Sequence, residues 1–170
     1  MTKQIVFYDE LQTPLGPLTL TATPDDILRI DFGSFSKNEQ KIKNYLSKAK
    51  LLNDLQNKII NHQIKDELTA YFNKTSTTFT VPNILFGTDF QKDVWRALMN
   101  IPYGETVTYK KVAMMINRPK AVRAVGGALN KNPFSIVLPC HRVIGSDGSL
   151  TGFGGGIDRK EQLLIFEQKN

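Results

Sequence analysis

The chain has 170 residues with a single cysteine and two histidines, and its 22 Lys and Arg against 16 Asp and Glu give a net charge of +6. One cysteine excludes an intramolecular disulfide and a cysteine-rich zinc site, so we expect no metal. No apolar run reaches the roughly 18 residues of a membrane span and none forms a signal core, so we expect a soluble cytoplasmic protein, and the positive charge favours a polyanionic partner.

The first half, residues 1–86, predicts a small α/β domain. Three short apolar segments separated by turn signals have the composition of strands: residues 5–8, 18–22 and 27–32. We expect them to form an antiparallel sheet joined by hairpins. Between residues 39 and 72 the apolar spacing becomes helical, which predicts one or two amphipathic helices flanking the sheet. Residues 77–81 are predicted as one more strand, and Pro82-Asn83 as the start of a linker.

The second half, residues 87–170, predicts a mainly helical domain. Thr88 and Gln91 have the spacing of a capping box, which indicates the start of a helix. The fold class is therefore α/β: a small sheet with a flanking helix, followed by a mostly helical half.

The sequence predicts two further short helices joined by a tight turn, which is the pattern of a helix-turn-helix. Thr108 can cap the first, and Pro119 suits the first position of the second, which ends near Asn130. Lysines and arginines surround the pair, as in nucleic-acid-binding proteins, although a purely structural hairpin is the alternative. Gly126 and Gly127 would weaken this helix by roughly 1 kcal/mol each, so we expect them to allow close approach to another surface.

The only cysteine follows an apolar run at residues 136–138. Pro139 cannot donate to a strand ladder, so the run predicts a short buried strand that ends there, with Cys140 at the mouth of a turn. A free cysteine is more often a small buried hydrophobe, but a rigid, partly open position beside His141 suits a reactive thiol. The glycine-rich residues 152–156 lack a following Gly-Lys-Ser/Thr, which favours an active-site loop over a phosphate-binding loop.

Four motifs stand in order between residues 90 and 167: Gly104-Glu105-Thr106-Val107-Thr108-Tyr109, Arg123-Ala124-Val125-Gly126-Gly127-Ala128, Asn132-Pro133 and Pro139-Cys140-His141-Arg142-Val143. Together they resemble the O6-alkylguanine-DNA alkyltransferases, also called methylated-DNA–protein-cysteine methyltransferases. The resemblance implies repair of O6-alkylguanine, and of O4-alkylthymine, in double-stranded DNA. The alkyl group would pass to Cys140 without a cofactor, in a protein that we expect to be a monomer.

The same resemblance implies roles for individual residues. His141 would reach Cys140 through a water and be held by Glu167, while Asn132 steadies the cysteine. Tyr109 would donate to N3 of an extruded guanine. The implied base pocket is formed by Tyr109, Val143, Phe153 and Gly154. The implied DNA-binding residues are Gln91, Tyr109, Lys110, Arg118, Arg123, Gly126, Gly127 and Ser146.

Two positions depart from some members of the family. Phe153 and Gly154 stand where those relatives carry tyrosine and serine, so a backbone contact at Gly154 survives but a side-chain hydroxyl does not.

Arg123 is implied to enter the base stack and fill the gap left by the extruded nucleotide.

Two other functions remain open on the sequence. A damage-responsive DNA-binding regulator would use alkylation as a signal, and a cysteine hydrolase would use Cys140 and His141 over many turnovers. A hydrolase forms a thioester that water cleaves, whereas an S-alkyl cysteine has no carbonyl for water to attack. The alkyltransferase should therefore stop after one equivalent.

Overall fold

In the computed structural model, residues 4–51, 54–60, 62–80, 82 and 85–168 are described. The chain divides into two compact units, Met1–Phe86 and Gly87–Asn170. None of the described helices combines the length and the apolar character that a membrane span requires.

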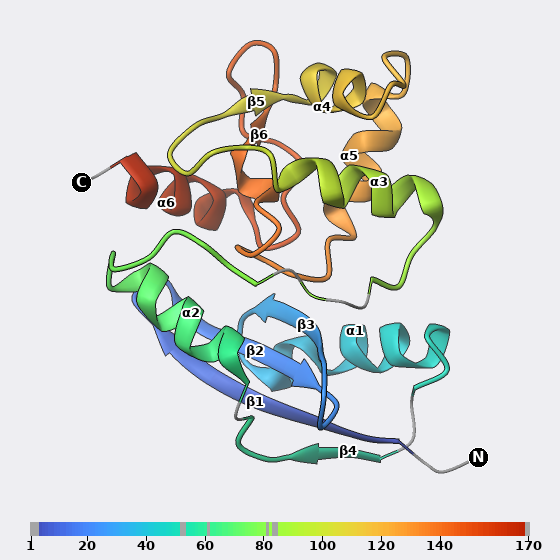
Figure 1. Cartoon of the computed structure of the whole chain (residues 1–170), viewed down its shortest axis with the longest axis vertical. Helices are drawn as coiled ribbons and strands as arrows, with labels where there is room; N and C mark the ends of the chain where they lie inside the picture. The colour runs from blue at the N-terminus through green and yellow to red at the C-terminus, as the bar shows by residue number, and fades with distance from the viewer. Residues whose placement is uncertain (1–3, 52–53, 61, 81, 83–84, 169–170) are drawn as a thin grey trace. The chain divides into compact units, whose positions relative to one another are not determined.

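The first unit contains a four-stranded sheet in the order β3-β2-β1-β4 (Figure 1). The antiparallel core consists of β1 (Ile5–Thr13), β2 (Gly16–Ala22) and β3 (Ile27–Phe32). This confirms the predicted sheet and its hairpins. β1 and β2 meet at a tight turn where Gly16 has φ +95°, a conformation that glycine adopts without strain.

The fourth strand and the missing fifth strand differ from the prediction. β4 (Asp54–Asn57) pairs in parallel with β1, inside the stretch that was predicted to be helical. The sequence does not indicate this strand, because its four mostly exposed residues show no apolar alternation. Residues 77–80 form no strand: the Thr80 amide and hydroxyl bond to the carboxylate of Glu67 instead of joining a ladder. Val81 and Asn83 lie outside the described residues.

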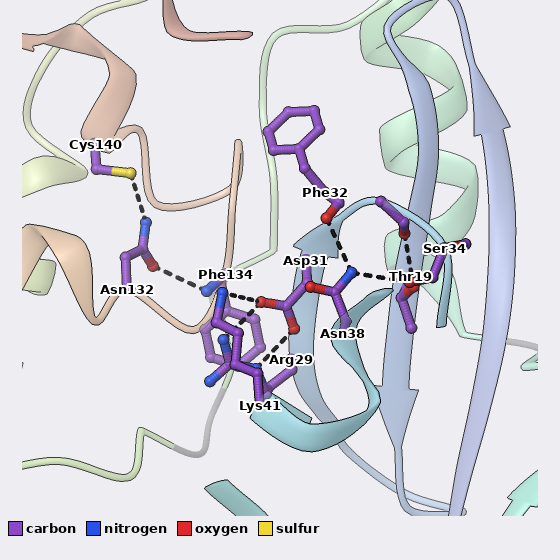
Figure 2. A network of polar contacts seen from close by, with 11 residues as sticks. Thr19, Arg29, Asp31, Phe32, Ser34, Asn38, Lys41, Asn132, Phe134 and Cys140 are labelled. Carbon is purple, nitrogen blue, oxygen red and sulfur yellow. Dashed lines mark hydrogen bonds and ion pairs between the residues drawn. The ribbon is translucent and has the colours of Figure 1, made fainter. Parts of the chain in front are cut away.

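Two helices accompany the sheet, α1 (Phe35–Lys48) and α2 (Gln63–Phe72). Ile42 and Leu46 of α1 form a buried cluster with Val6 and Leu28 of the sheet, which is the apolar face predicted from helical spacing. A second, polar network lies on β3 (Figure 2), where the Arg29 guanidinium donates two hydrogen bonds, of 2.7 and 2.6 Å, to the buried carboxylate of Asp31.

The second unit is mainly helical and contains two very short strands. Its elements are α3 (Asp89–Leu98), β5 (Val107–Thr108), α4 (Tyr109–Met115), α5 (Val122–Asn130), the 3₁₀ helix η1 (Cys140–Arg142), β6 (Val143–Ile144) and α6 (Ile157–Gln168). Trp95 of α3 is buried, and its indole Nε1 donates to the Ala128 carbonyl of α5 over 2.8 Å. This bond fixes α3 against α5.

Local capping sets the helix starts. The predicted capping box is confirmed: Thr88 Oγ1 accepts from the Gln91 amide at 3.2 Å, and Gln91 Oε1 accepts from the Thr88 amide at 3.0 Å. Thr108 likewise caps α4 through the Lys111 amide. Pro119, however, does not begin α5, because residues 119–120 form a turn and the helix starts at Val122.

The α4–α5 connection is a tight turn. Asn117 has φ +57°, and the amides of Asn117 and Arg118 donate to the carbonyls of Met114 and Ala113. This pair of bonds closes α4 in a Schellman motif and lets the chain reverse into α5 within a few residues. The two helices pack against one another.

Candidate active site

The cysteine lies in a turn and not after a strand. Residues 136–138 lie in a turn in which the Leu138 amide donates to the Phe134 carbonyl and Ile136 takes φ +74°. The apolar run therefore buries its side chains without joining a sheet. Cys140 opens η1 and is only 5% exposed, so the expectation of a partly open thiol is wrong.

Asn132 holds the cysteine and its loop together (Figure 2). Its side-chain Nδ2 donates to the Leu138 carbonyl at 2.7 Å and to Cys140 Sγ at 3.1 Å, and its Oδ1 accepts from the Phe134 amide at 2.9 Å. One buried amide thus satisfies both sides of the turn and places a donor directly on the sulfur. A donor in that position favours the thiolate over the thiol.

His141, Arg142 and Glu167 form a buried charged cluster. His141 Nε2 lies 2.7 Å from Glu167 Oε1, and Arg142 donates to both carboxylate oxygens, from Nε at 2.9 Å and from its terminal nitrogen at 2.8 Å. Arg142 also donates to the Ile101 carbonyl at 2.8 Å. The cluster joins η1 to the end of α6, so Glu167 is held in a fixed orientation.

The cluster determines which histidine nitrogen is available. Burial would raise the pKa of Glu167, but the hydrogen bonds from His141 and Arg142 outweigh it and hold that pKa well below its usual value. Burial lowers the pKa of His141, with Glu167 opposing the shift. Neutral His141 therefore carries its proton on Nε2, facing a carboxylate that can only accept. Its Nδ1 is buried and has no hydrogen-bond partner among the described residues.

The thiol itself needs a proton acceptor. Burial raises the pKa of Cys140, while the hydrogen bond from Asn132 and the charge of Lys160 act in the opposite direction. A thiol with a raised pKa is mostly neutral at pH 7, and only the thiolate is strongly nucleophilic. His141 is the next residue in the chain, and its Nδ1, which has no hydrogen-bond partner among the described residues, can accept a proton.

A two-stranded parallel pairing brings Tyr109 to the cysteine segment. Val107 and Thr108 of β5 pair with Val143 and Ile144 of β6, directly after η1. Tyr109 is the first residue of α4, and its hydroxyl donates to the Thr151 carbonyl. A Cβ at Gly152 would lie 2.8 Å from that hydroxyl, and Gly152 has φ +70°, so both the space and the backbone favour glycine there.

The remaining predicted pocket residues occupy different environments. Val143 and Phe153 are buried, whereas Gly154 is exposed. A Cβ at Gly154 would lie 3.3 Å from the Asn130 carbonyl, so a larger side chain there would need a small local shift.

The predicted DNA-binding residues lie around α3, α4 and α5, apart from Ser146, which is exposed in the turn after β6. The side chains of Lys110 and Arg123 are exposed, and Arg118 lies 3.8 Å from Asp93 and over the ring of Phe90. The family resemblance implies a DNA contact for Gln91, but the side-chain oxygen of Gln91 already accepts a hydrogen bond from the Thr88 amide at the start of its own helix. A methyl group added to Gly127 would have no other atom within 4 Å, so the packing of the protein does not require glycine there.

Two buried basic residues received no role from the sequence. Arg142 stands inside the cysteine motif, yet only the structure reveals its bonds to Glu167. Lys160 is 1% exposed and bonds to the carbonyls of Val143 and Thr151. Helical spacing could have indicated it, because Lys160, Leu163 and Glu167 lie on one face of α6. Among the described residues, no group of three His, Cys, Asp or Glu side chains could hold a metal ion.

Both units match domains of one known protein family. The ribonuclease-like domain of 6-O-methylguanine DNA methyltransferase matches residues 6–83, and the DNA binding domain of the same family matches residues 89–169. The methylated-DNA–protein-cysteine methyltransferase of Methanosarcina barkeri is 42% identical over 165 residues, 97% of this chain and 99% of that protein.

Solved structures agree with the sequence matches. The crystal structure of Mycobacterium tuberculosis OGT in complex with DNA has a TM-score of 0.79 and 40% identity, covering 95% of this chain and 92% of that one. The O6-methylguanine-DNA methyltransferase of Pyrococcus kodakaraensis, at 22% identity, shares the fold with a TM-score of 0.66. Both units of this chain, including its cysteine motif, therefore belong to the 6-O-methylguanine DNA methyltransferase family, the methylated-DNA–protein-cysteine methyltransferases.

Proposed function

We propose that this protein repairs O6-alkylguanine, and O4-alkylthymine, in double-stranded DNA by one irreversible transfer of the alkyl group to Cys140. The observation that carries the assignment is a pair of buried contacts, from Asn132 to Cys140 and from His141 to Glu167. It supplies a fixed sulfur, an oriented base and a permanent counter-charge. We further propose that the protein acts as a monomer.

The transfer is an in-line displacement. His141 Nδ1 accepts the Cys140 proton through a bridging water, and the resulting imidazolium is stabilised by Glu167. The thiolate then forms an S–C bond to the alkyl carbon as the C–O6 bond breaks and its electron pair passes to the guanine. The Tyr109 hydroxyl donates to N3 of the base, which spreads and stabilises the negative charge on the leaving group.

The target carbon is inaccessible in stacked duplex, so the nucleotide must leave the helix. Residues 87–170 carry 12 Lys and Arg against seven Asp and Glu, whereas residues 1–86 carry ten against nine. This asymmetry supports the second unit as the DNA-binding surface. We propose that α4 and α5 act as a helix-turn-helix with Arg123 filling the base stack, and that Gln91, Lys110, Arg118 and Ser146 contact the phosphate backbone.

The glycine pair on α5 provides a test of this surface. Gly127→Ala is expected to stabilise the free protein by up to about 1 kcal/mol, because alanine is the better helix former and nothing nearby obstructs its methyl group. The same methyl should weaken duplex binding if DNA backbone approaches α5 there. Thermal unfolding and a duplex titration measure the two effects. Tighter or unchanged duplex binding would remove Gly127 from the interface.

Mass spectrometry tests the function directly. After incubation with an O6-methylguanine duplex, Cys140 should gain about 14 Da, one methyl replacing one hydrogen, and turnover should stop at one equivalent. Cys140→Ser should repair no DNA and show no gain. Repaired DNA with unmodified protein would contradict the transfer, and continued turnover would favour the hydrolase. Binding of the duplex with neither repair nor a mass gain on Cys140 would favour a DNA-binding protein that performs no transfer.

A further inference from the structure

Lys160 is a buried cation that the transfer mechanism does not use. It lies in α6 with 1% of its surface exposed, and its Nζ donates to the Val143 carbonyl and, at 2.9 Å, to the Thr151 carbonyl. No carboxylate lies within 4.0 Å of it among the residues that the structure describes. An ammonium without a counter-ion is costly to bury, so the two carbonyls are what keep it there.

The two carbonyls belong to opposite ends of one loop. Val143 directly follows η1 and opens β6, while Thr151 comes after the tight turn in which the Gly145 amide donates to the Ser149 carbonyl. A single ammonium therefore closes the segment from Val143 to Thr151 into a ring. Without that cation, the buried Val143 carbonyl would lose this donor and the two ends would no longer be tied.

The Thr151 carbonyl has a second partner, the hydroxyl of Tyr109. Lys160 and Tyr109 thus share one acceptor, and the Lys160 ammonium lies 5.7 Å from the centre of the Tyr109 ring. When the Tyr109 hydroxyl turns to a guanine, the carbonyl that it leaves is still bonded to Lys160. The cation therefore keeps the loop in place during the exchange of partners.

We infer that Lys160 is a positioning residue for the alkyl transfer: it ties the Val143 and Thr151 carbonyls together and so holds the base-reading loop and the Tyr109 hydroxyl where the extruded base needs them. This inference rests on the function proposed above. The Lys160 charge also favours the Cys140 thiolate, but that effect reaches the sulfur without passing through the base pocket. The two effects can be separated by reagents that differ in their need for the pocket.

The test is a double-mutant cycle on the full-length protein. Rates of duplex O6-methylguanine repair are measured for wild type, Lys160→Met, Tyr109→Phe and the double variant. Lys160→Met should lose about tenfold to a hundredfold, the range for losing hydrogen bonds from a charged donor. The double variant should lose little more than the worse single variant, because both changes act on one carbonyl. A lysine with only a structural role would give multiplied losses.

A second readout separates the pocket from the thiol. Iodoacetamide alkylates Cys140 without using the base pocket, so Lys160→Met should slow this reaction much less than it slows duplex repair. Equal slowing of both would overturn the inference, as would a wild-type repair rate. The exposed Lys48→Met serves as the matched control. If Lys160→Met does not fold, Lys160→Gln keeps a neutral donor and should give the same ordering of losses.

The repair rates of the two single variants distinguish an error in the proposed function from an error in the Lys160 inference. A wild-type repair rate for Tyr109→Phe would count against the role proposed for Tyr109, and the Lys160 inference would then stand or fall on the iodoacetamide comparison. If Tyr109→Phe repairs the duplex slowly while Lys160→Met repairs it at the wild-type rate, only the Lys160 inference is overturned.

Discussion

Glu167→Gln is expected to slow alkyl transfer by on the order of 10³-fold while leaving the substrate-binding surface intact, by analogy with triads that lose their acidic member. The carboxylate fixes Nε2 as the protonated nitrogen of His141 and stabilises the imidazolium that forms when Cys140 loses its proton. A neutral amide can present its nitrogen to Nε2, which favours the wrong tautomer. Single-turnover rates on an O6-methylguanine duplex measure the loss, and a loss below tenfold would contradict the relay.

The same substitution should destabilise the fold. Arg142 is buried and bonds to both oxygens of Glu167, so the variant leaves a buried guanidinium without its counter-ion, at a cost of about 3–5 kcal/mol. The folded-state pKa of Glu167 lies below its ordinary value of 4.5. The stabilisation is therefore present above the unfolded-state pKa and is lost as pH falls through the folded-state pKa.

Unfolding measurements can verify that sign. Between about pH 5 and pH 2, the difference in unfolding free energy between wild type and Glu167→Gln should shrink, because the unfolded wild-type chain takes up a proton at Glu167 while the folded cluster resists protonation. Glu161→Gln, an exposed position on the same helix, is the matched control and should behave as wild type. A difference that grows toward acid would contradict the assigned pKa direction.

Arg123→Ala is expected to separate two substrates. Filling the gap in the base stack offsets an unstacking cost of a few kcal/mol, so losing the side chain should slow duplex repair by roughly 10²-fold. Free O6-benzylguanine needs no extrusion and should react at nearly the wild-type rate. The two rates, measured side by side, give the ratio directly.

Arg96→Ala is the control for a general loss of positive charge. Arg96 is also an exposed arginine, but it lies in the last turn of α3 and not on α5. It should lower duplex affinity modestly without changing the ratio of the two rates. Equal slowing of both substrates by Arg123→Ala would remove the stack-filling role.

The sequence predicts correctly those features of the fold that depend on residues close together in the chain. The caps at Thr88 and Thr108 are predicted correctly because a cap depends only on residues three positions apart. The antiparallel strands follow from alternation and turn residues. β4 escapes prediction because a polar edge strand takes its pairing from β1, about 50 residues away, and not from its own composition.

The site divides in the same way. Three apolar residues before a proline predict a strand at residues 136–138, but their backbone satisfies itself in a turn fixed by Asn132. The contact between His141 and Glu167 spans 26 residues and is implied by family resemblance, since spacing alone carries no such information. Lys160 escapes prediction because a lysine in an amphipathic helix usually faces solvent. Its spacing with Leu163 indicates the buried face, but only tertiary structure reveals the two carbonyls that bond to it.

Thr108 ends β5 and caps α4, and Tyr109 follows it as the first helical residue. The proposed DNA contacts of α4 and the proposed role of Tyr109 in bond breaking are consequently linked through a single peptide unit. A tilt of α4 on binding would move Tyr109 with it, because Tyr109 is the first residue of that helix. In the proposed mechanism, the direction of the Tyr109 hydroxyl therefore depends on how α4 and α5 bind the duplex.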